Sequence, residues 1–315
     1  PVGRHMRVFV TGGAGFIGSH VCERLLRHGA EVIAFDDFSS GQTRIEGATI
    51  IEGDVRNFDD VLSGMSDCTH VAHLAAFASV PASIANPEQS ESINLHGTLN
   101  VIKAAKMVGI KRIVYSSTAA VYGDTIELPV TETAVTQCLS PYAEDKLAAE
   151  VAILHSGIEA ISLRYFNVHG PRQNPEGAYA AVIPAFIQML MDHQSPTIFG
   201  TGEATRDFVK VSDVAELNFS ALTTENESAL GEVYNVASGS TLTVLELFTT
   251  LRELLADKNV EISNVEPIFA PNREGDILHS SASIEKAKRL LGFNPETNPH
   301  RALAATVEAY WDQRE

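Results

Sequence analysis

A cluster of glycines directly follows a short apolar run near the start of the chain, in the stretch VFVTGGAGFIGSH at residues 8–20. Gly12, Gly15 and Gly18 stand three residues apart, and Gly13 adds the overlapping GxGxxG spacing. A turn that binds a dinucleotide needs positive φ, no Cβ where the pyrophosphate approaches, and free N–H groups at the helix start. The cluster therefore predicts a nucleotide-binding turn, for which the alternative is an ordinary connection between a strand and a helix.

The next apolar run, EVIAF at 31–35, leads into Asp36, about 20 residues beyond the glycines. A carboxylate in this place accepts hydrogen bonds from both ribose hydroxyls of the adenosine and repels a 2′-phosphate. A capping or loop carboxylate is the alternative, but it fits this position less well. Asp36 thus predicts NAD, and not NADP, as the cofactor.

Apolar runs alternate with amphipathic stretches as far as Phe166. Runs with Val and Ile at most positions are typical of parallel strands covered by helices on both faces. We therefore predict an α/β fold with a doubly wound parallel sheet, a Rossmann domain over 6–166 with a returning segment near 207–237. Residues 167–206 and 238–315 are expected to form a smaller C-terminal α/β substrate domain at the carboxyl edge of the sheet.

The balance of 23 basic and 40 acidic residues gives a net charge of −17, which disfavours nucleic acid or an anionic membrane surface as a partner. Cys22, Cys68 and Cys138 are far apart and lack metal-ligand spacing, so no metal site is predicted. Such cysteines, and the lack of an apolar run of about 20 residues, indicate a cytoplasmic protein. Residues 1–5, ahead of Met6, are interpreted as a remnant of expression.

Tyr142 and Lys146 are spaced to lie one turn apart on the same face of a predicted helix. A tyrosine titrates near pH 10, so a base that works near neutrality needs its phenolate stabilised by about 4 kcal/mol. A neighbouring ammonium and the positive nicotinamide of NAD⁺ both act in that direction. The strand before this helix ends in three hydroxyl residues, and Thr118 can relay a substrate proton to Tyr142. Ser116 and Ser117 can equally be turn residues.

A series of motifs in a fixed order extends this pattern from Met6 to about Tyr310 and resembles the extended short-chain dehydrogenase/reductases, specifically the UDP-hexose 4-epimerases. The motifs are TGGAGFIGSH, DVR at 54–56, HLAA at 73–76, NLHGT at 94–98, SSTAAVYGD at 116–124, PYAEDK at 141–146 and RYFNVHGP at 164–171. The resemblance implies that Tyr142 is the base, that Thr118 is its hydroxyl partner and that Lys146 reaches the nicotinamide ribose.

The same resemblance implies a larger set of cofactor contacts. Asp54 and Val55 are expected at the adenine, and Leu74, Ala75 and Ala76 along the cofactor channel. The complete set of expected cofactor residues is Gly12, Gly15, Phe16, Ile17, Gly18, Asp36, Asp54, Val55, Leu74, Ala75, Ala76, Asn94, Ser116, Tyr142, Lys146 and Tyr165.

The resemblance also places Asn167, Phe199, Arg206 and Arg273 around a UDP moiety, with Asp276 at the uridine ribose. Guanidinium groups can bind phosphate oxygens in pairs, which an acidic protein needs for an anionic substrate. Each arginine taken alone can equally be a surface ion pair, and Phe199 can fill the core instead of stacking on uracil.

Small residues in the expected sugar pocket bear on the choice of sugar. Ser280 stands where relatives that act on glucose carry a bulky residue, and the stretch YAAVIP at 179–184 resembles relatives that accept N-acetylhexosamines. The further substrate contacts implied are Ser79, Thr118, Ala181 and Val182. We therefore expect UDP-GlcNAc and UDP-GalNAc as substrates, with UDP-Glc and UDP-Gal as further possibilities, although Ser280 can also be a loop serine without contacts.

The predicted reaction is NAD-dependent 4-epimerisation through a 4-keto sugar. A nucleotide-sugar dehydratase or decarboxylase on the same fold is the first alternative, but Ala119 and Ala120 stand where 4,6-dehydratases resembling this family carry an Asp-Glu pair. Asp124 or Glu144 would have to serve an unusual elimination. A non-catalytic regulator that binds NAD or UDP-sugars is the second alternative. A homodimer through helices at about 90–108 and 141–155 is implied by resemblance.

Overall fold

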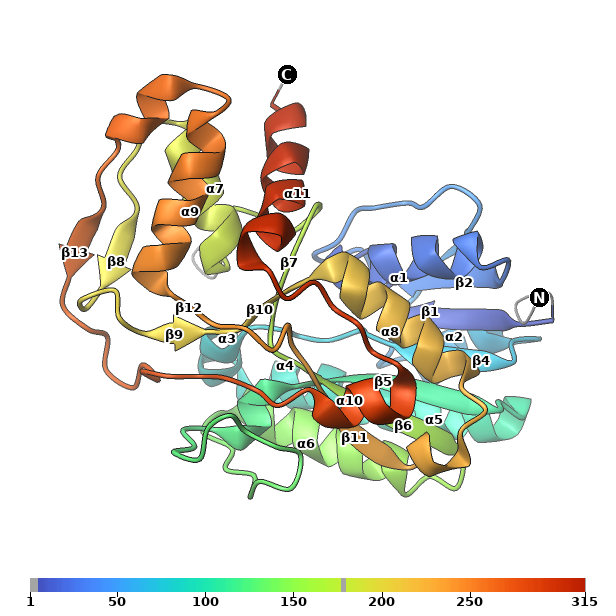
Figure 1. Ribbon diagram of the computed structural model, residues 1–315. Helices are drawn as coiled ribbons and strands as arrows, with labels where there is room; N and C mark the ends of the chain where they lie inside the picture. Colours follow the sequence, from blue (N-terminus) through green and yellow to red (C-terminus); the bar gives the residue numbers. More distant parts are fainter. Residues whose placement is uncertain (1–4, 177–179, 315) are drawn as a thin grey trace.

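A parallel sheet forms the centre of the molecule (Figure 1). The computed structural model describes residues 5–176 and 180–314, and its large sheet has the strand order β11-β6-β5-β4-β1-β2-β3 with every neighbouring pair parallel. The strands are β1 (Arg7–Thr11), β2 (Glu31–Asp36), β3 (Thr49–Glu52), β4 (His70–His73), β5 (Arg112–Thr118), β6 (Glu159–Tyr165) and β11 (Glu232–Val236). Because the order reverses between β1 and β4, their carboxyl ends form the edge where such sheets bind ligands. The predicted doubly wound fold is confirmed.

Helices cover both faces of this sheet, and β1 contributes to both cores. Val8 and Val10 pack with residues of α1 and α8, whereas Phe9 points to the other face and packs with residues of α2, α5 and α6. This is why apolar residues fill nearly every position of the strand. The helices are α1 (Phe16–Arg27), α2 (Phe58–Met65), α5 (Gly97–Val108), α6 (Pro141–Leu154) and α8 (Val211–Thr223).

Short helical segments follow the carboxyl ends of two central strands. Between β4 and α5 the chain forms α3 (Val80–Ala85), α4 (Pro87–Glu91) and the π-helical turn η1 (Ser92–His96). After β5 it forms the 3₁₀ turn η2 (Ala119–Tyr122). Both connections therefore lie at the ligand-binding edge of the sheet.

A separate core lies in the C-terminal part of the chain, which stands above the sheet in Figure 1. It is built mainly by α7 (Val182–Met191), α9 (Val244–Ala256) and α11 (Pro299–Asp312), with Ile187, Leu251 and Leu303 fully enclosed. Three small strand pairs accompany these helices: β7 (Asn167–His169) with β10 (Phe208–Lys210), β8 (Thr197–Phe199) with β13 (Ile268–Ala270), and β9 (Thr205–Arg206) with β12 (Leu242–Thr243).

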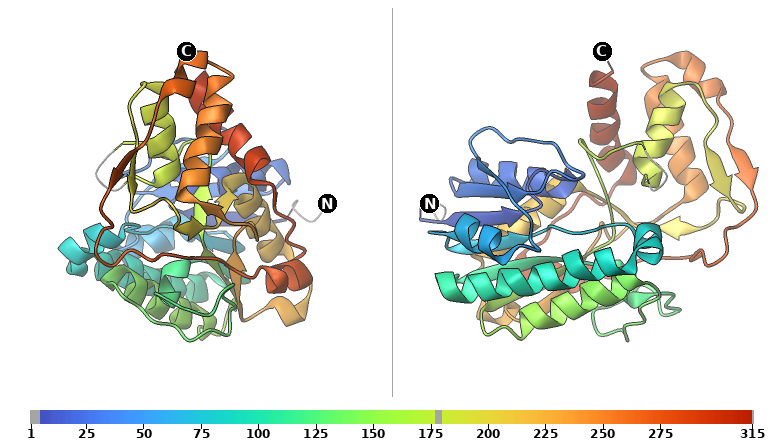
Figure 2. Two further views of the ribbon diagram at one scale, coloured as in Figure 1. Left: turned by 60° about the vertical axis from the view of Figure 1, so that its left-hand side comes forward. Right: turned by 180° about the vertical axis from the view of Figure 1, so that it is seen from behind.

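The chain crosses between the two cores more than once. After β10, α8 and β11 return to the large sheet, and α10 (Glu285–Leu291) also packs against α8 and β11. Part of the 238–315 segment therefore lies beside the sheet and not over its edge, as the two views of Figure 2 show. The short turns η3 (Glu227–Ala229) and η4 (Val260–Asn264) complete the described structure. None of the described helices has both the length and the apolar character needed to span a membrane.

Candidate active site

The glycine turn joins β1 to α1 with no room for side chains. Gly12 has φ +68°, and a Cβ there would lie 2.8 Å from the Ala75 amide nitrogen. A Cβ on Gly18 would overlap the carbonyl oxygen of Gly12. Gly15 precedes the first turn of α1 and provides no side-chain cap, so the N–H groups at this helix start are available to an anion. The turn thus fits the pyrophosphate of a dinucleotide.

Asp36, at the end of β2, lies against this turn. Its Oδ2 accepts a hydrogen bond from the Ala14 amide at 2.9 Å, and its Oδ1 accepts one from the Phe38 amide at 2.9 Å. Burial raises the pKa of Asp36, while the two amides oppose that change. The carboxylate is therefore fixed at the glycine turn, as a contact with the adenosine ribose requires.

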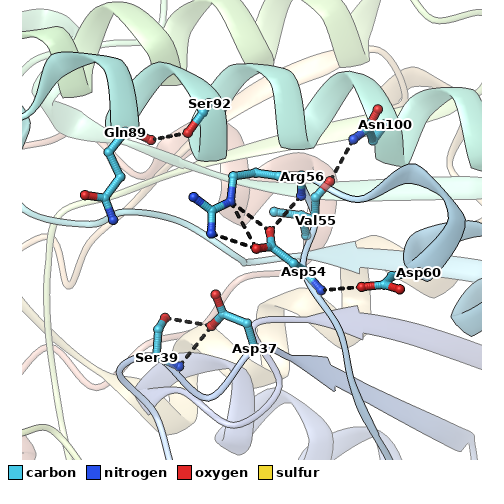
Figure 3. Close-up of polar contacts among 9 residues, drawn as sticks. All are labelled: Asp37, Ser39, Asp54, Val55, Arg56, Asp60, Gln89, Ser92 and Asn100. Atoms are coloured by element: carbon cyan, nitrogen blue, oxygen red, sulfur yellow. Dashed lines mark hydrogen bonds and ion pairs between the residues drawn. The ribbon is translucent and has the colours of Figure 1, made fainter.

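The expected adenine contacts lie at the end of the neighbouring strand β3 (Figure 3). Asp54 forms a two-pronged ion pair with Arg56, with Nη2 to Oδ2 at 2.7 Å and Nε to Oδ1 at 3.0 Å. Hydrogen bonds from Arg56 hold the pKa of Asp54 below its usual value. The Val55 carbonyl accepts a bond from Asn100 Nδ2 at 2.9 Å, which ties this segment to α5.

Helix α6 brings the predicted base to the end of β5. Ser140 caps the helix by accepting a bond from the Ala143 amide at 3.1 Å, and Ser83 Oγ accepts one from the Tyr142 amide at 3.1 Å. Burial raises the pKa of Tyr142, and the side chain of Thr118 lies near enough to its hydroxyl to lower it. The tyrosine and threonine singled out from the sequence therefore lie close together.

Lys146 lies one turn along α6 and is 3% exposed. Its Nζ donates to the Ser116 carbonyl at 2.6 Å and lies 4.6 Å from the centre of the Tyr115 ring. Burial lowers the pKa of Lys146 to about 7, and the negative charge of Glu150 opposes this. A small change in its surroundings can therefore switch this ammonium between its charged and neutral forms near neutral pH.

Glu150, a further turn along the same face of α6, was not identified from the sequence. It is 2% exposed and accepts bonds from Arg164 at 2.7 and 3.0 Å and from Ser162 Oγ at 2.8 Å. Its position four residues after Lys146 is the signal that could have revealed it. Lys146 and Glu150 follow Tyr142 along one face of α6, and Arg164 of β6 is paired with Glu150, so the charges alternate in sign.

Asn94 holds the cofactor channel in shape through its own side chain. Its Oδ1 accepts from the Phe77 amide at 2.9 Å, and its Nδ2 donates to the Phe77 carbonyl and to Ser90 Oγ, each at 3.2 Å. Ser90 in turn donates to Asp145 on α6 at 2.7 Å. The expected contact of Asn94 with the cofactor stays a prediction, beside these bonds within the chain.

His73 ties the opening of the same channel to β1. Thr11 Oγ1 accepts from the amides of Leu74 and Ala75, each at 3.0 Å, and lies 2.6 Å from His73 Nδ1. His73 Nε2 lies 2.8 Å from Thr98 Oγ1. With Thr11 donating to Nδ1, the proton of the neutral ring is on Nε2 and is donated to Thr98. Leu74, Ala75 and the following Ala76 are thus anchored from β1 and α5.

Ser116 and Tyr165 also have partners inside the protein. Ser116 Oγ lies 2.7 Å from the Tyr165 hydroxyl, which accepts a further bond from Asn218 Nδ2 at 2.8 Å. Burial raises the pKa of Tyr165 to about 12. Their hydroxyls join β5, β6 and α8, and the Ser116 carbonyl accepts the bond from Lys146. The expected contact of both residues with the cofactor stays a prediction.

The residues expected around UDP lie together but contact the chain itself. Arg206 donates to the carbonyls of Thr205 at 2.7 Å and Ile277 at 2.6 Å, and burial lowers its pKa. The Arg273 guanidinium lies 4.4 Å from the centre of the Phe199 ring. Phe199 is 39% exposed and so does not fill the core.

Three of the remaining residues expected at the substrate form hydrogen bonds within the chain. Asp276 Oδ2 accepts from Arg273 Nε at 3.2 Å, and the Ser280 amide donates to the Thr205 carbonyl at 3.1 Å. Asn167 Nδ2 donates to the Asp207 carbonyl at 3.2 Å. The others are Ser79, the cap of α3, and Ala181 and Val182 at the start of α7; Tyr179, in the same stretch, lies outside the described residues.

Known proteins resemble this chain in sequence and in fold. Residues 8–237 match the family described as NAD dependent epimerase/dehydratase. A putative UDP-glucose 4-epimerase of Methanocaldococcus jannaschii is 38% identical over 308 residues, covering 95% of this chain and 97% of that protein. The crystal structure of a UDP-glucose 4-epimerase with UDP-glucose from Thermotoga maritima has a TM-score of 0.91 and 34% identity, covering 98% of this chain and 100% of that chain.

A second solved structure bears on the sugar. A UDP-N-acetylglucosamine 4-epimerase from Methanobrevibacter ruminantium, in complex with UDP-N-acetylmuramic acid, has a TM-score of 0.89 and 35% identity. The match covers 98% of this chain and 99% of that one. The two solved relatives are therefore about equally similar to this chain in identity and fold, although they are named for different sugars.

Proposed function

Because this chain belongs to the NAD-dependent epimerase/dehydratase family, we propose that it is an NAD-dependent isomerase that inverts C4 of a UDP-hexose. The observation that carries the proposal is the placement of Tyr142 beside Thr118 at the end of β5, with Lys146 one turn further along α6 and bonded to the Ser116 carbonyl of the same strand. A hydroxyl pair backed by an ammonium can take a proton from a sugar hydroxyl and return it.

The residues of the glycine turn fit NAD. Gly12 and Gly18 leave no room for a Cβ, the start of α1 has no side-chain cap, and Asp36 is fixed beside the turn. When bound, NAD supplies the oxidant and then the reductant for C4 of the sugar. The chain supplies the proton transfers and holds the reacting groups.

We infer that Tyr142 accepts the C4 hydroxyl proton at its phenolic oxygen and that Thr118 passes the proton to it. Burial opposes ionisation of Tyr142, so a positive charge nearby is needed to stabilise the phenolate. Lys146 can supply this charge, and Glu150 favours its protonated form. The catalytic role of Glu150 is indirect, because it acts on Lys146 and not on the substrate.

For the choice of sugar, we propose that the enzyme accepts UDP-GlcNAc and UDP-GalNAc, with UDP-Glc and UDP-Gal as further substrates. Ser280 supports it because its side chain is small and its backbone is bonded beside Arg206. A tyrosine in its place would fill the volume needed by a 2-acetamido group. We expect Ser280→Tyr to reduce the relative rate with UDP-GlcNAc against UDP-Glc by about tenfold, as loss of a fitting pocket costs roughly 1–3 kcal/mol.

Elimination in place of epimerisation is the second candidate reaction, and the structure favours it less. A dehydratase of the usual kind needs carboxyl groups directly after Thr118, where this chain has Ala119 and Ala120 in η2. Asp124 and Glu144, the other two candidates, are exposed to solvent. The third candidate, a regulator without activity, does not need a tyrosine beside a threonine with a buried lysine one helical turn away.

Proton NMR of the purified protein with UDP-GlcNAc, and separately with UDP-Glc, tests the function without added NAD. Appearance of the 4-epimer supports both the reaction and a retained cofactor. A keto or unsaturated product would support elimination, and no change with either sugar, even after NAD is added, would contradict the proposal. Tyr142→Phe is the control, because it removes the base and keeps the ring.

We also propose a homodimer through α5 and α6, which lie side by side in the right-hand view of Figure 2. Leu99, Met107 and Val151 on these helices are exposed, at 42%, 63% and 47%. Analytical ultracentrifugation of the wild type and of Met107→Glu tests the pairing. A wild-type monomer at micromolar concentration would contradict it.

A further inference from the structure

A cavity of about 300 Å³ lies between α1, α8 and α11, away from the glycine turn and from Tyr142. Its lining includes the cations Arg24, Arg27, Arg172 and Lys210, and Glu23 is the one carboxylate among its described lining residues. This concentration of positive charge is notable in a chain with 23 basic and 40 acidic residues. None of the residues assigned above to the cofactor or the substrate lines this cavity.

Two of these cations form no ion pair within the described residues, although Asp213 lies near enough to Lys210 for the lysine to lower its pKa. Arg24 is paired with Glu216 at 3.1 Å, and Arg172 Nη1 is paired with Glu23 at 2.8 Å. Neither Arg27 nor Lys210 has a side-chain hydrogen bond or ion pair within the described part of the chain. The cavity therefore has an excess of positive charge.

One arm of the Arg172 guanidinium is left without a hydrogen-bond partner. Its Nε donates to Ser19 Oγ at 2.9 Å, but the buried Nη2 has no hydrogen-bond partner among the described residues. A guanidinium with two bonds used and one arm free is a common donor to phosphate oxygens.

The start of α8 also borders the cavity. Lys210 is the residue before its first turn and makes no side-chain cap, while Val211 and Ser212 line the cavity. The first-turn N–H groups of this 13-residue helix therefore lack a capping side chain. Asp213 does not line the cavity, and its Oδ2 instead accepts a bond from the Glu296 amide at 2.9 Å.

His169 gives a second, independent indication that the cavity binds a ligand. It lines the cavity and is 1% exposed, and its Nε2 has no partner within the described residues. Its Nδ1 lies 2.9 Å from Thr306 Oγ1 on α11. Burial, together with nearby Lys210, lowers the pKa of His169 to about 4, so the ring is neutral. With Thr306 donating to Nδ1, Nε2 carries an N–H that only a ligand or water can satisfy.

We propose that this cavity binds a compact phosphate-bearing polyanion of the size of inorganic diphosphate, held by Lys210, Arg27 and Arg172 at the start of α8. Ala302 and Ala305 of α11 border the cavity with small side chains and leave room for the ligand. Since α1 and α8 belong to the sheet core and Leu303 of α11 belongs to the C-terminal core, the bound anion joins the two.

Isothermal titration calorimetry with inorganic pyrophosphate tests the site on the NAD-loaded protein. Saturating UDP is included so that the sugar-nucleotide site is already filled. We expect Lys210→Gln and Arg27→Gln each to weaken binding by roughly tenfold or more, since a hydrogen bond to a charged group contributes about 1.5–3 kcal/mol. Lys288→Gln on α10 removes the same charge from an exposed residue outside the cavity and should leave the affinity unchanged.

Three results would overturn the proposal. These are no binding of pyrophosphate by the wild type in the presence of UDP, equal affinity of Lys210→Gln and Lys288→Gln, and equal affinity of the wild type for citrate and pyrophosphate at matched ionic strength. The first two reject the site, and the third rejects its preference for phosphate. The titration does not depend on epimerase activity.

Discussion

The polar side chains in the two halves of the candidate active site have different kinds of partners. At the sheet edge, Tyr142 lies beside Thr118 of β5, Lys146 follows Tyr142 one turn along α6, and Glu150 follows a further turn along the helix. On the C-terminal side, Arg206 is bonded to backbone carbonyls and Arg273 covers Phe199. Under the proposed function, the first half carries out the chemistry and the second half exchanges these internal contacts for contacts with UDP. Catalysis and substrate holding are therefore separable by mutation.

Tyr142→Phe should separate catalysis from UDP binding more strongly than the other variants. General acid–base groups contribute about 10²- to 10⁴-fold, so we expect kcat to fall by that factor while the affinity for UDP stays the same. Stopped assays of epimer formation and calorimetry with UDP measure the two quantities. A variant that loses UDP binding in parallel with turnover would show that the two halves are not independent.

Glu150→Gln tests whether the negative charge of Glu150 stabilises the fold and raises the pKa of Lys146. The change removes the charge that faces Arg164 and Lys146 in a buried place, and breaking a buried pair costs about 3–5 kcal/mol. We expect a lower urea midpoint and a lower pKa for Lys146. Asp145→Asn, on the same helix, keeps an oxygen to accept the bond from Ser90 and serves as the control. Equal stability of both variants would contradict the role given to Glu150.

The parts of the site that the sequence predicted are those carried by local spacing. Gly12 and Gly15 lie between β1 and α1 and Gly18 lies in the first turn of α1, while Tyr142 and Lys146 are one turn apart on α6, so their geometry follows from the secondary structure. Arg206 bonds to Ile277, 71 residues along the chain, and no local pattern predicts such a partner. Asn94 was singled out from the sequence, but its link to Phe77 depends on how the π-helical turn packs and could not be predicted.

Arg206→Gln should affect the second half of the site alone. If the guanidinium leaves the Ile277 carbonyl to bind the diphosphate, its loss removes a charged hydrogen bond of about 1.5–3 kcal/mol. We expect KM for the UDP-sugar to rise roughly 10- to 100-fold with a smaller change in kcat. Arg273→Gln provides the matched comparison from the partner arginine. A fall in kcat with KM unchanged would mean that Arg206 belongs with the catalytic half.

Lys146→Met should change the pH dependence of stability, with a small effect per pH unit. Lys146 has a pKa of about 7 in the folded chain and 10.5 as its ordinary value. Between these values the unfolded chain binds the proton and the folded chain does not, so the free energy of unfolding rises with pH by at most about 1.4 kcal/mol per unit. Below pH 7 both states are protonated and this contribution no longer changes. Urea unfolding at several pH values should show the rise in the wild type and not in the variant, and parallel curves would mean that Lys146 keeps its ordinary pKa inside the fold.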